Sequence, residues 1–229
     1  MKNYSTLYLD LDNTIFDFLK SENRAIKSVL ELHKLPCDED TARLYSSINL
    51  KWWEKFERGE IAKKEIFTGR FSELLSAING KANPEDMSLD YFKALSCGHD
   101  LIDGALPLLK SLKDFGYTVC ATTNGVSMTQ HRRINDSGID KFLDYVFVSE
   151  DAGHQKPERE YFDYVVNNSP EKDREKILII GDSQTSDILG GVNSDIDTCW
   201  YNPNGLKPVY NSRFEVRSLA EISDILCKK

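Results

Sequence analysis

This chain of 229 residues lacks long apolar runs and any excess of basic residues. No run reaches the roughly 18 apolar residues that a transmembrane helix needs. The first residues, Met1–Tyr4, do not form the apolar segment of a signal peptide, so we expect a cytoplasmic protein without a membrane partner. Acidic residues outnumber basic ones by 37 to 29, and the resulting formal net charge of −8 does not offer the basic surface that nucleic acids bind.

Paired cysteines are also missing. The five cysteines are an odd number and form no CxxC pair, which argues against both a disulfide framework and a zinc site. We therefore expect single thiols in a reducing compartment at Cys37, Cys97, Cys120, Cys199 and Cys227.

Short apolar runs of strand length alternate with helical patterns along much of the chain. The strand-like runs are residues 4–11, 117–122, 145–148, 176–180 and 198–201. Helical patterns include residues 106–115, which end at Gly116, and residues 218–229. This alternation predicts an α/β fold with a parallel sheet and helices on both of its faces.

Residues 18–97 differ, because they show helical periodicity and almost no strand signal. The predicted helices are residues 25–33, 40–57, 62–78 and 84–95, the last with Asn83 as its cap. This segment is much longer than a crossover between parallel strands requires. We therefore expect residues 18–97 to form an inserted helical bundle, and residues 1–17 and 98–229 to form the core.

The first of four polar motifs is Asp10-Leu11-Asp12-Asn13-Thr14, directly after the first predicted strand. Two carboxylates two residues apart on an extended segment lie on the same side, which suits a nucleophile and an acid/base. Considered alone, the motif fits a solvated turn equally well.

The second and third motifs are Thr122-Thr123-Asn124-Gly125 and Lys156-Pro157. Hydroxyl, amide and glycine groups offer hydrogen bonds to an anion, and a lysine can place an ammonium over a phosphate. Taken singly, these motifs are also typical of an ordinary strand exit and of a solvated lysine.

The fourth motif begins at Gly181-Asp182 and extends to Asp187 after a strongly apolar run. Carboxylates there are costly unless they are paired or bind a cation such as Mg²⁺, although Asp182 or Ser183 could instead cap a helix. Because carboxyl ends of parallel strands share one edge of a sheet, the four motifs together form a set suited to phosphoryl transfer.

These residues, in this order, resemble the four motifs of the haloacid dehalogenase superfamily, whose fold is a doubly wound, Rossmann-like core with a helical cap. The resemblance implies that Asp10 attacks phosphorus to form an aspartyl-phosphate, and that Asp12 protonates the leaving oxygen and later activates water. It further implies that Thr123, Asn124 and Lys156 bind the phosphoryl group.

The resemblance also implies a Mg²⁺ cofactor, held by the Asp10 and Asp182 carboxylates and the Asp12 backbone carbonyl. Asp187 would support the site through water or by orienting Lys156. Dehalogenases of this superfamily lack an aspartate at the Asp12 position, so Asp12 favours phosphate chemistry. Sugar-phosphate mutases have both aspartates and remain an alternative.

The segment 49–61, with Trp52 and Trp53, and the later Arg70-Phe71 are similar to the cap of bacterial pyrimidine 5′-nucleotidases. Asn49, Trp53 and Arg70 are therefore candidate substrate contacts, with the indole as a stacking face for a base. At helical spacing, Trp53 and Phe56 fit a bundle core equally well.

We therefore predict a monomeric phosphomonoesterase for a small phosphorylated molecule, and specifically a 5′-nucleotidase for nucleoside monophosphates. The alternatives are a phosphatase for another small metabolite such as phosphoglycolate, a mutase, and a non-catalytic scaffold that binds a phosphorylated ligand. The complete set of motif residues argues against the scaffold, because a protein that only binds needs no nucleophile and acid together.

Overall fold

The computed structural model describes residues 4–227, and its contacts divide the chain into two compact units. Unit 1 comprises the chain up to Asp17, Leu101–Ser127 and the chain from Ser137 onward. Unit 2 comprises Phe18–Asp100 and Met128–Asp136. Among the described residues, no helix has the length and apolar character that crossing a membrane requires.

Unit 1 contains a six-stranded parallel sheet in the order β3-β2-β1-β4-β5-β6, which confirms the predicted α/β class. The strands are β1 (Thr6–Leu9), β2 (Thr118–Thr123), β3 (Tyr145–Val148), β4 (Ile177–Gly181), β5 (Asp197–Tyr201) and β6 (Phe214–Val216). The central strands β1 and β4 are wholly buried, as expected for a parallel sheet covered on both faces. The edge strand β6 was not among the predicted strands.

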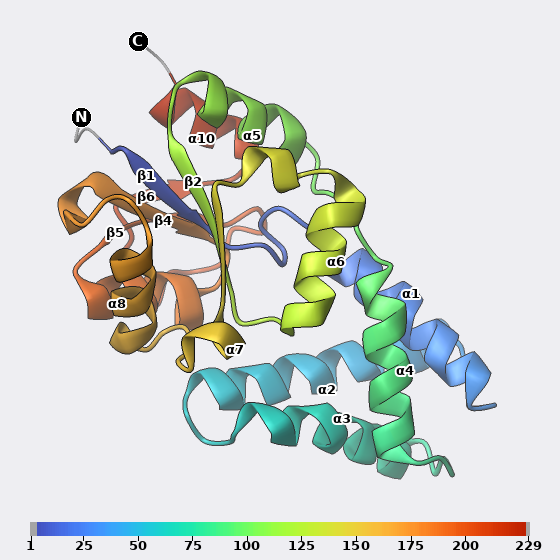
Figure 1. Cartoon of the computed structure of the whole chain (residues 1–229). Coiled ribbons are helices and arrows are strands. Elements are labelled where there is room, and N and C mark those ends of the chain that lie inside the picture. Colours follow the sequence, from blue (N-terminus) through green and yellow to red (C-terminus); the bar gives the residue numbers. More distant parts are fainter. Residues whose placement is uncertain (1–3, 228–229) are drawn as a thin grey trace. The chain divides into compact units, whose positions relative to one another are not determined.

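Helices cover the two faces of this sheet (Figure 1). On one face, α8 (Arg159–Asn168) packs Phe162 and Val165 against Tyr8 and Ile179 of the strands. On the other face lie α5 (Ala105–Asp114) and α10 (Leu219–Leu226), which pack against each other. The other helices of unit 1 are α7 (Ser149–Ala152), α9 (Leu189–Ser194), the short 3₁₀ helices η1 (Asp140–Phe142) and η2 (Arg174–Lys176), and the π-helix η3 (Gln184–Ile188).

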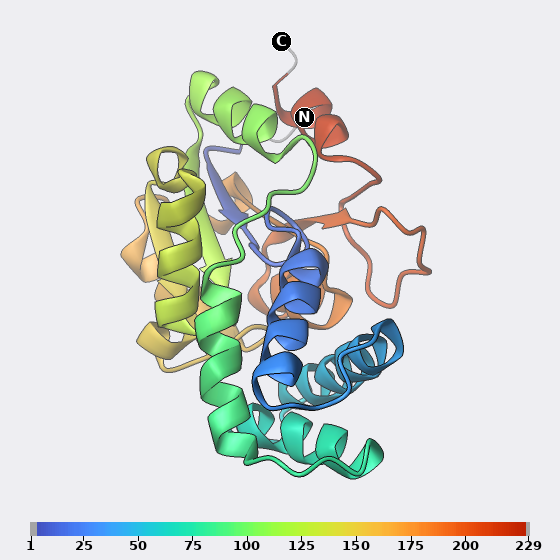
Figure 2. The same cartoon turned by 90° about the vertical axis from the view of Figure 1, so that its right-hand side faces the viewer.

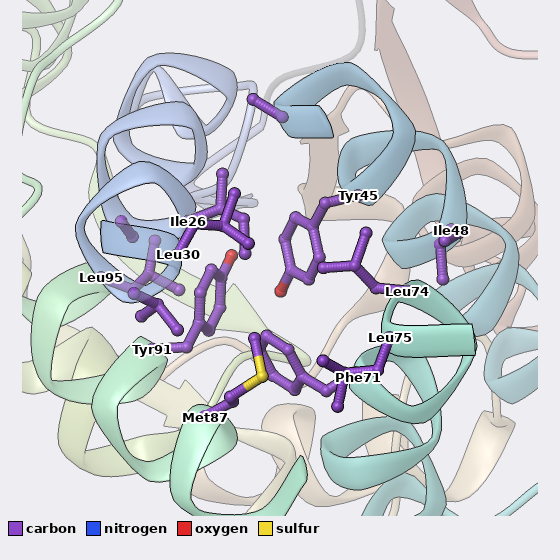
Figure 3. Close-up of a cluster of buried hydrophobic side chains, with 13 residues drawn as sticks. Ile26, Leu30, Tyr45, Ile48, Phe71, Leu74, Leu75, Met87, Tyr91 and Leu95 are labelled. Carbon is purple, nitrogen blue, oxygen red and sulfur yellow. The ribbon is translucent and has the colours of Figure 1, made fainter. Parts of the chain in front are cut away.

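Unit 2 is helical. Its helices are α1 (Phe18–Leu32), α2 (Glu39–Glu57), α3 (Lys63–Ala77), α4 (Pro84–Ser96) and most of α6 (Ser127–Ser137). Helices α1 and α4 run side by side although they are far apart in sequence (Figure 2). The four predicted helices correspond to α1–α4, although α1 begins earlier, at Phe18. Side chains from these four helices, among them Tyr45, Phe71 and Tyr91, form one apolar core (Figure 3).

Helix α6 groups with unit 2, whereas residues 98–229 were all expected in the core. Its buried Arg133 donates from Nε to the carbonyl oxygen of Gly98 at 2.7 Å, and Arg132 donates to Ser96 Oγ at 3.2 Å. These bonds connect α6 to the C-terminal end of α4 and the residues just after it.

Candidate active site

The strand order places three of the motifs at one edge of the sheet. Strand β1 lies between β2 and β4, so Asp10 lies between the segments that follow Thr123 and Gly181. In open sheets of this type, ligands bind at the carboxyl ends of the strands, where the strand order reverses. Residues separated by more than a hundred positions therefore meet at one place.

A tight turn follows β1. The carbonyl oxygen of Leu11 accepts from the backbone N–H groups of Thr14, Ile15 and Phe16 at 3.3, 2.8 and 2.8 Å. Asn13 has a φ of +62°, a left-handed conformation that asparagine adopts more readily than most residues. The turn leaves Asp12 partly exposed and directs Thr14 Oγ1 toward Asp182 Oδ1 at 3.5 Å.

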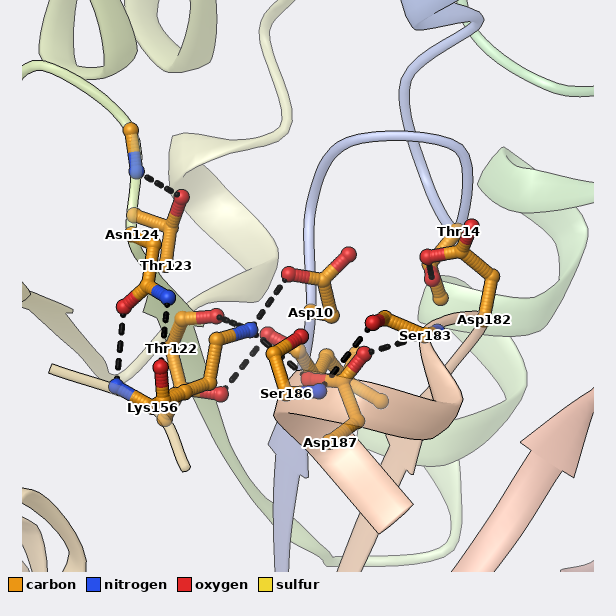
Figure 4. Close-up of polar contacts among 12 residues, drawn as sticks. Asp10, Thr14, Thr122, Thr123, Asn124, Lys156, Asp182, Ser183, Ser186 and Asp187 are labelled. Atoms are coloured by element: carbon orange, nitrogen blue, oxygen red, sulfur yellow. Dashed lines mark hydrogen bonds and ion pairs between the residues drawn. The ribbon is translucent and has the colours of Figure 1, made fainter. Parts of the chain in front are cut away.

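Lys156 places its ammonium among the acidic groups of the site (Figure 4). Its Nζ donates to Asp10 Oδ1 at 2.6 Å, to Asp187 Oδ1 at 2.7 Å and to the Thr122 carbonyl oxygen at 3.0 Å. An ammonium has three hydrogens, so each of them has an acceptor. The side chain is almost fully buried, which makes these charged hydrogen bonds strong.

Asn124 contacts the backbone of Lys156. Its Nδ2 donates to the Lys156 carbonyl oxygen at 2.8 Å, and its Oδ1 accepts from the Lys156 N–H at 2.9 Å (Figure 4). The neighbouring Thr123 Oγ1 accepts from the Gly125 N–H at 3.0 Å. The binding of phosphate by Thr123 and Asn124 stays a prediction.

The segment after β4 positions two carboxylates. Asp187 is fully buried, and its second oxygen accepts from the Ser183 N–H at 3.1 Å. The Trp200 indole N–H donates to the Asp182 carbonyl oxygen at 2.8 Å. Ser183 also caps the following turn through the Ser186 N–H, which is the local role expected for a residue there.

Sequence reasoning missed the contribution of Trp200. The residue lies in β5 directly beside Gly181 in the sheet register, so it is adjacent to the fourth motif. A tryptophan in an apolar strand looks like an ordinary core residue, and only the strand register would have placed its indole next to Asp182.

Two acids of the site have perturbed pKa values. Burial raises the pKa of Asp10 to about 7, while the Lys156 charge opposes that rise and the Asp187 charge adds to it. Burial, followed by the charges of Asp10 and Asp187, raises the pKa of Asp182 well above its usual value. Burial lowers the pKa of Lys156, but the two carboxylates outweigh it and keep the ammonium charged.

The donor set fits a hard divalent cation. Carboxylate oxygens of Asp10, Asp182 and Asp187 all lie within 4.8 Å of one another. Oxygens on opposite sides of one Mg²⁺ are about 4.2 Å apart, so these oxygens need only small movements to share an ion. The three acids have one ammonium beside them, and a cation would offset the burial and the mutual repulsion that raise the pKa values of Asp10 and Asp182.

The predicted substrate contacts all lie in unit 2. Asn49 and Arg70 are buried and touch each other, because Arg70 Nη1 donates to Asn49 Oδ1 at 2.7 Å. Asn49 in turn donates to the buried Glu22 at 2.7 Å. Trp53 is partly buried and packs edge-on against Phe56, with 5.7 Å between ring centroids. A substrate role for Asn49, Trp53 and Arg70 stays a prediction.

Trp52 packs between α2 and α3. Its indole N–H donates to Glu73 at 2.8 Å, and the Lys55 ammonium lies 5.1 Å from the ring centroid. Gly69 of α3 packs so closely that a Cβ there would lie 2.1 Å from the Trp52 ring. The ring therefore fills the contact between α2 and α3.

Comparison with known proteins identifies the family of the chain. Residues 7–201 match the family model described as haloacid dehalogenase-like hydrolase, and the chain belongs to that family. It is 41% identical to the HAD-hydrolase YfnB of Bacillus subtilis over 229 residues, which cover 99% of this chain and 97% of YfnB. A crystal structure of YfnB bound to magnesium superposes with a TM-score of 0.94 at 40% identity, covering 98% of this chain and 99% of that one.

Two further relatives have names that state an activity. The chain is 33% identical to the pyrimidine 5′-nucleotidase PynA of Streptococcus pneumoniae, over 98% of this chain and 96% of PynA. It is 27% identical to the pyrimidine 5′-nucleotidase YjjG of Escherichia coli, over 97% of each chain. The protein is thus a hydrolase of this family, and its relatives include two proteins named as pyrimidine 5′-nucleotidases.

Proposed function

We propose that this hydrolase is a Mg²⁺-dependent phosphomonoesterase that releases phosphate from nucleoside 5′-monophosphates through an aspartyl-phosphate. The observation that carries the proposal is the contact of the Lys156 ammonium with Asp10, beside the buried Asp187 and the partly buried Asp182. A buried nucleophile next to a fixed cation suits attack on an anionic ester, because the cation reduces the charge repulsion. The names of PynA and YjjG support the nucleotide as substrate.

The chain's own residues carry both chemical steps. An Asp10 carboxylate oxygen forms a bond to phosphorus while the bond from phosphorus to the ester oxygen breaks, and Asp12 gives its proton to that leaving oxygen. Asp12 then takes a proton from a water molecule that attacks the same phosphorus. The bond to Asp10 breaks and inorganic phosphate leaves, so Asp10 and Asp12 return to their starting states.

The bound cation would be held by the carboxylates of Asp10 and Asp182 and the backbone carbonyl of Asp12. When bound, Mg²⁺ supplies positive charge that stabilises the phosphoryl oxygens as negative charge develops on them. Lys156 adds a second positive charge, and Asp187 keeps that ammonium in place through its 2.7 Å contact.

Selection of the nucleoside requires residues other than those that act on the phosphoryl group. The unit 1 residues described act on the phosphoryl group, which every phosphomonoester has in common. Unit 2 contains the segment 49–61 and Arg70-Phe71, whose similarity to nucleotidase caps makes it the candidate for recognising the base. We therefore infer that unit 2 acts as the substrate-selecting cap.

Magnesium should stabilise the protein through Asp182. At about one hundred times its dissociation constant, a ligand adds about 2.7 kcal/mol, which raises the Tm of a chain of this size by roughly 5–10 °C. Asp182→Asn should abolish this rise. It should also raise the Tm of the metal-free protein, because it removes one of three crowded acids.

The matched control for that thermal shift experiment is Asp195→Asn. This acid is exposed and pairs with Arg159 at 2.9 Å, so its variant loses one charge of unit 1 outside the cluster. The Asp195→Asn protein should respond to Mg²⁺ as the wild type does. An equal Mg²⁺ response in the Asp182→Asn protein would contradict the assigned metal ligand.

A substrate panel tests the proposed activity. Phosphate release from pyrimidine and purine monophosphates, sugar phosphates and phosphoglycolate is measured with Mg²⁺ and with excess chelator. We expect kcat/KM at least about tenfold higher for pyrimidine nucleotides, equivalent to about 1.4 kcal/mol of differential binding in the transition state. A preference for phosphoglycolate, isomerisation of a sugar phosphate without release, or no turnover at all would favour one of the alternatives instead.

A further inference from the structure

We propose that Asn124 is a positioning residue that fixes the Lys156 ammonium against Asp10, and that it acts through the Lys156 backbone. The proposal rests on the proposed function, in which Lys156 is the fixed cation. Its basis is the Asn124 clasp, by which we mean the two hydrogen bonds that join the Asn124 amide to the Lys156 N–H and carbonyl oxygen.

Lys156 has no helix or strand to hold it. It lies in the irregular segment between α7 and α8, 32 residues after Asn124. The clasp uses both polar groups of its backbone, at 2.9 and 2.8 Å, in the way that a neighbouring strand would. A side chain at the end of β2 thus connects this segment to the sheet that also positions Asp10.

The clasp determines where the ammonium can lie. The Lys156 side chain is buried, and its Nζ contacts Asp10, Asp187 and the Thr122 carbonyl oxygen. Thr122 belongs to β2, as does the residue before Asn124, so the same strand end holds both the backbone and the ammonium of Lys156. Without the clasp, the two buried backbone groups would lose their partners and the segment could shift.

A double-mutant cycle separates this indirect role from direct phosphate binding by Asn124. Asn124→Ala should lower kcat/KM about 100-fold, mainly through kcat, because a displacement of about 1 Å at a catalytic group costs that much. In a Lys156→Met background the same substitution should change kcat/KM less than about threefold, since nothing remains for the clasp to position. If the double variant instead lost kcat/KM by the product of the two single losses, the proposal would be overturned.

The chain offers a matched control in Asn202. Its buried side chain makes the same pair of bonds, from Nδ2 to the Leu206 carbonyl oxygen and from the Leu206 N–H to Oδ1, both at 2.9 Å. Asn202→Ala should cost comparable stability and leave kcat within about threefold of the wild type. An equal loss of kcat in the Asn202 and Asn124 variants would show that the effect is only structural.

A second variant and a spectroscopic measurement keep the proposal testable. If Asn124→Ala does not fold, Asn124→Asp replaces it in the cycle, because it retains the acceptor for the Lys156 N–H and lacks the donor to the carbonyl oxygen. A ¹H–¹⁵N correlation spectrum of the lysine ammonium groups gives a readout that needs no activity.

In that spectrum, the buried Lys156 ammonium should give a slowly exchanging signal that is absent in Lys156→Met. The signal should be retained in Asn202→Ala and lost or broadened in Asn124→Ala. An unchanged signal in Asn124→Ala would overturn the positioning role of Asn124, whatever rate of phosphate release that variant shows. If the wild-type protein released no phosphate but the variants showed these spectral changes, only the proposed function would be contradicted.

Discussion

Asp10→Asn should abolish Mg²⁺-dependent phosphate release, lowering kcat/KM by at least about 10⁴-fold. The amide is neutral and a poor nucleophile, yet it has nearly the shape of the carboxylate and can still accept from Lys156 Nζ at the position of Oδ1. The fold should therefore persist. Phosphate release on the best substrate of the panel, together with circular dichroism, measures both properties on the same sample.

Asp195→Asn again serves as the control, since it removes an exposed acid of unit 1 and should keep full activity. Retention of more than about 1% of the wild-type rate in a folded Asp10→Asn protein would exclude Asp10 as the nucleophile. The site would then have to act through a water molecule that attacks the ester directly.

The parallel sheet was predictable because its central strands are short apolar runs bounded by polar motifs. Ile177–Gly181 is buried throughout, and such a run gives a clear signal in the sequence. The edge strand Phe214–Val216 gives almost none, since it has three residues and only Val216 is buried. Its strand conformation depends on pairing with β5, which the sequence does not reveal.

Helix α6 shows a second limit of hydrophobic periodicity. Its buried face consists of Thr129, Gln130, Arg133 and Ile134, whereas the apolar Met128 is 68% exposed. A helix that packs through polar side chains has no apolar stripe to detect. Its contacts within unit 2 include the hydrogen bond from Arg133 to the Gly98 carbonyl oxygen, which becomes visible only in three dimensions.

The acids of the candidate site could be predicted to meet because each follows a strand of one parallel sheet. The path of the loop that carries Lys156 could not be predicted, since it has no regular structure and its position depends on Asn124. The sequence thus indicates which groups are present at the sheet edge. The contacts show that the Asn124 side chain is hydrogen-bonded to the Lys156 backbone.

Lys156→Met should have the second largest effect, on stability as well as on activity. The substitution leaves Asp10 and Asp187 buried without their ammonium partner, and breaking a buried ion pair costs about 3–5 kcal/mol. It also removes a fixed positive charge from the reacting phosphoryl group, which should lower kcat/KM about 10³-fold. Urea unfolding and steady-state kinetics measure the two losses.

Added Mg²⁺ should recover part of the stability of Lys156→Met, because a cation can replace some of the missing positive charge among the three acids. Lys172→Met is the matched control. The Lys172 ammonium also has three acceptors, but they are the neutral carbonyl oxygens of Val166, Asn167 and Ser169. This variant should lose only about 1 kcal/mol and keep its activity. The contrary outcome is that both variants lose the same stability and that Lys156→Met stays within tenfold of the wild-type kcat/KM. The Lys156 ammonium would then be only a structural element of unit 1. The acids would need another source of positive charge to attack a phosphate ester.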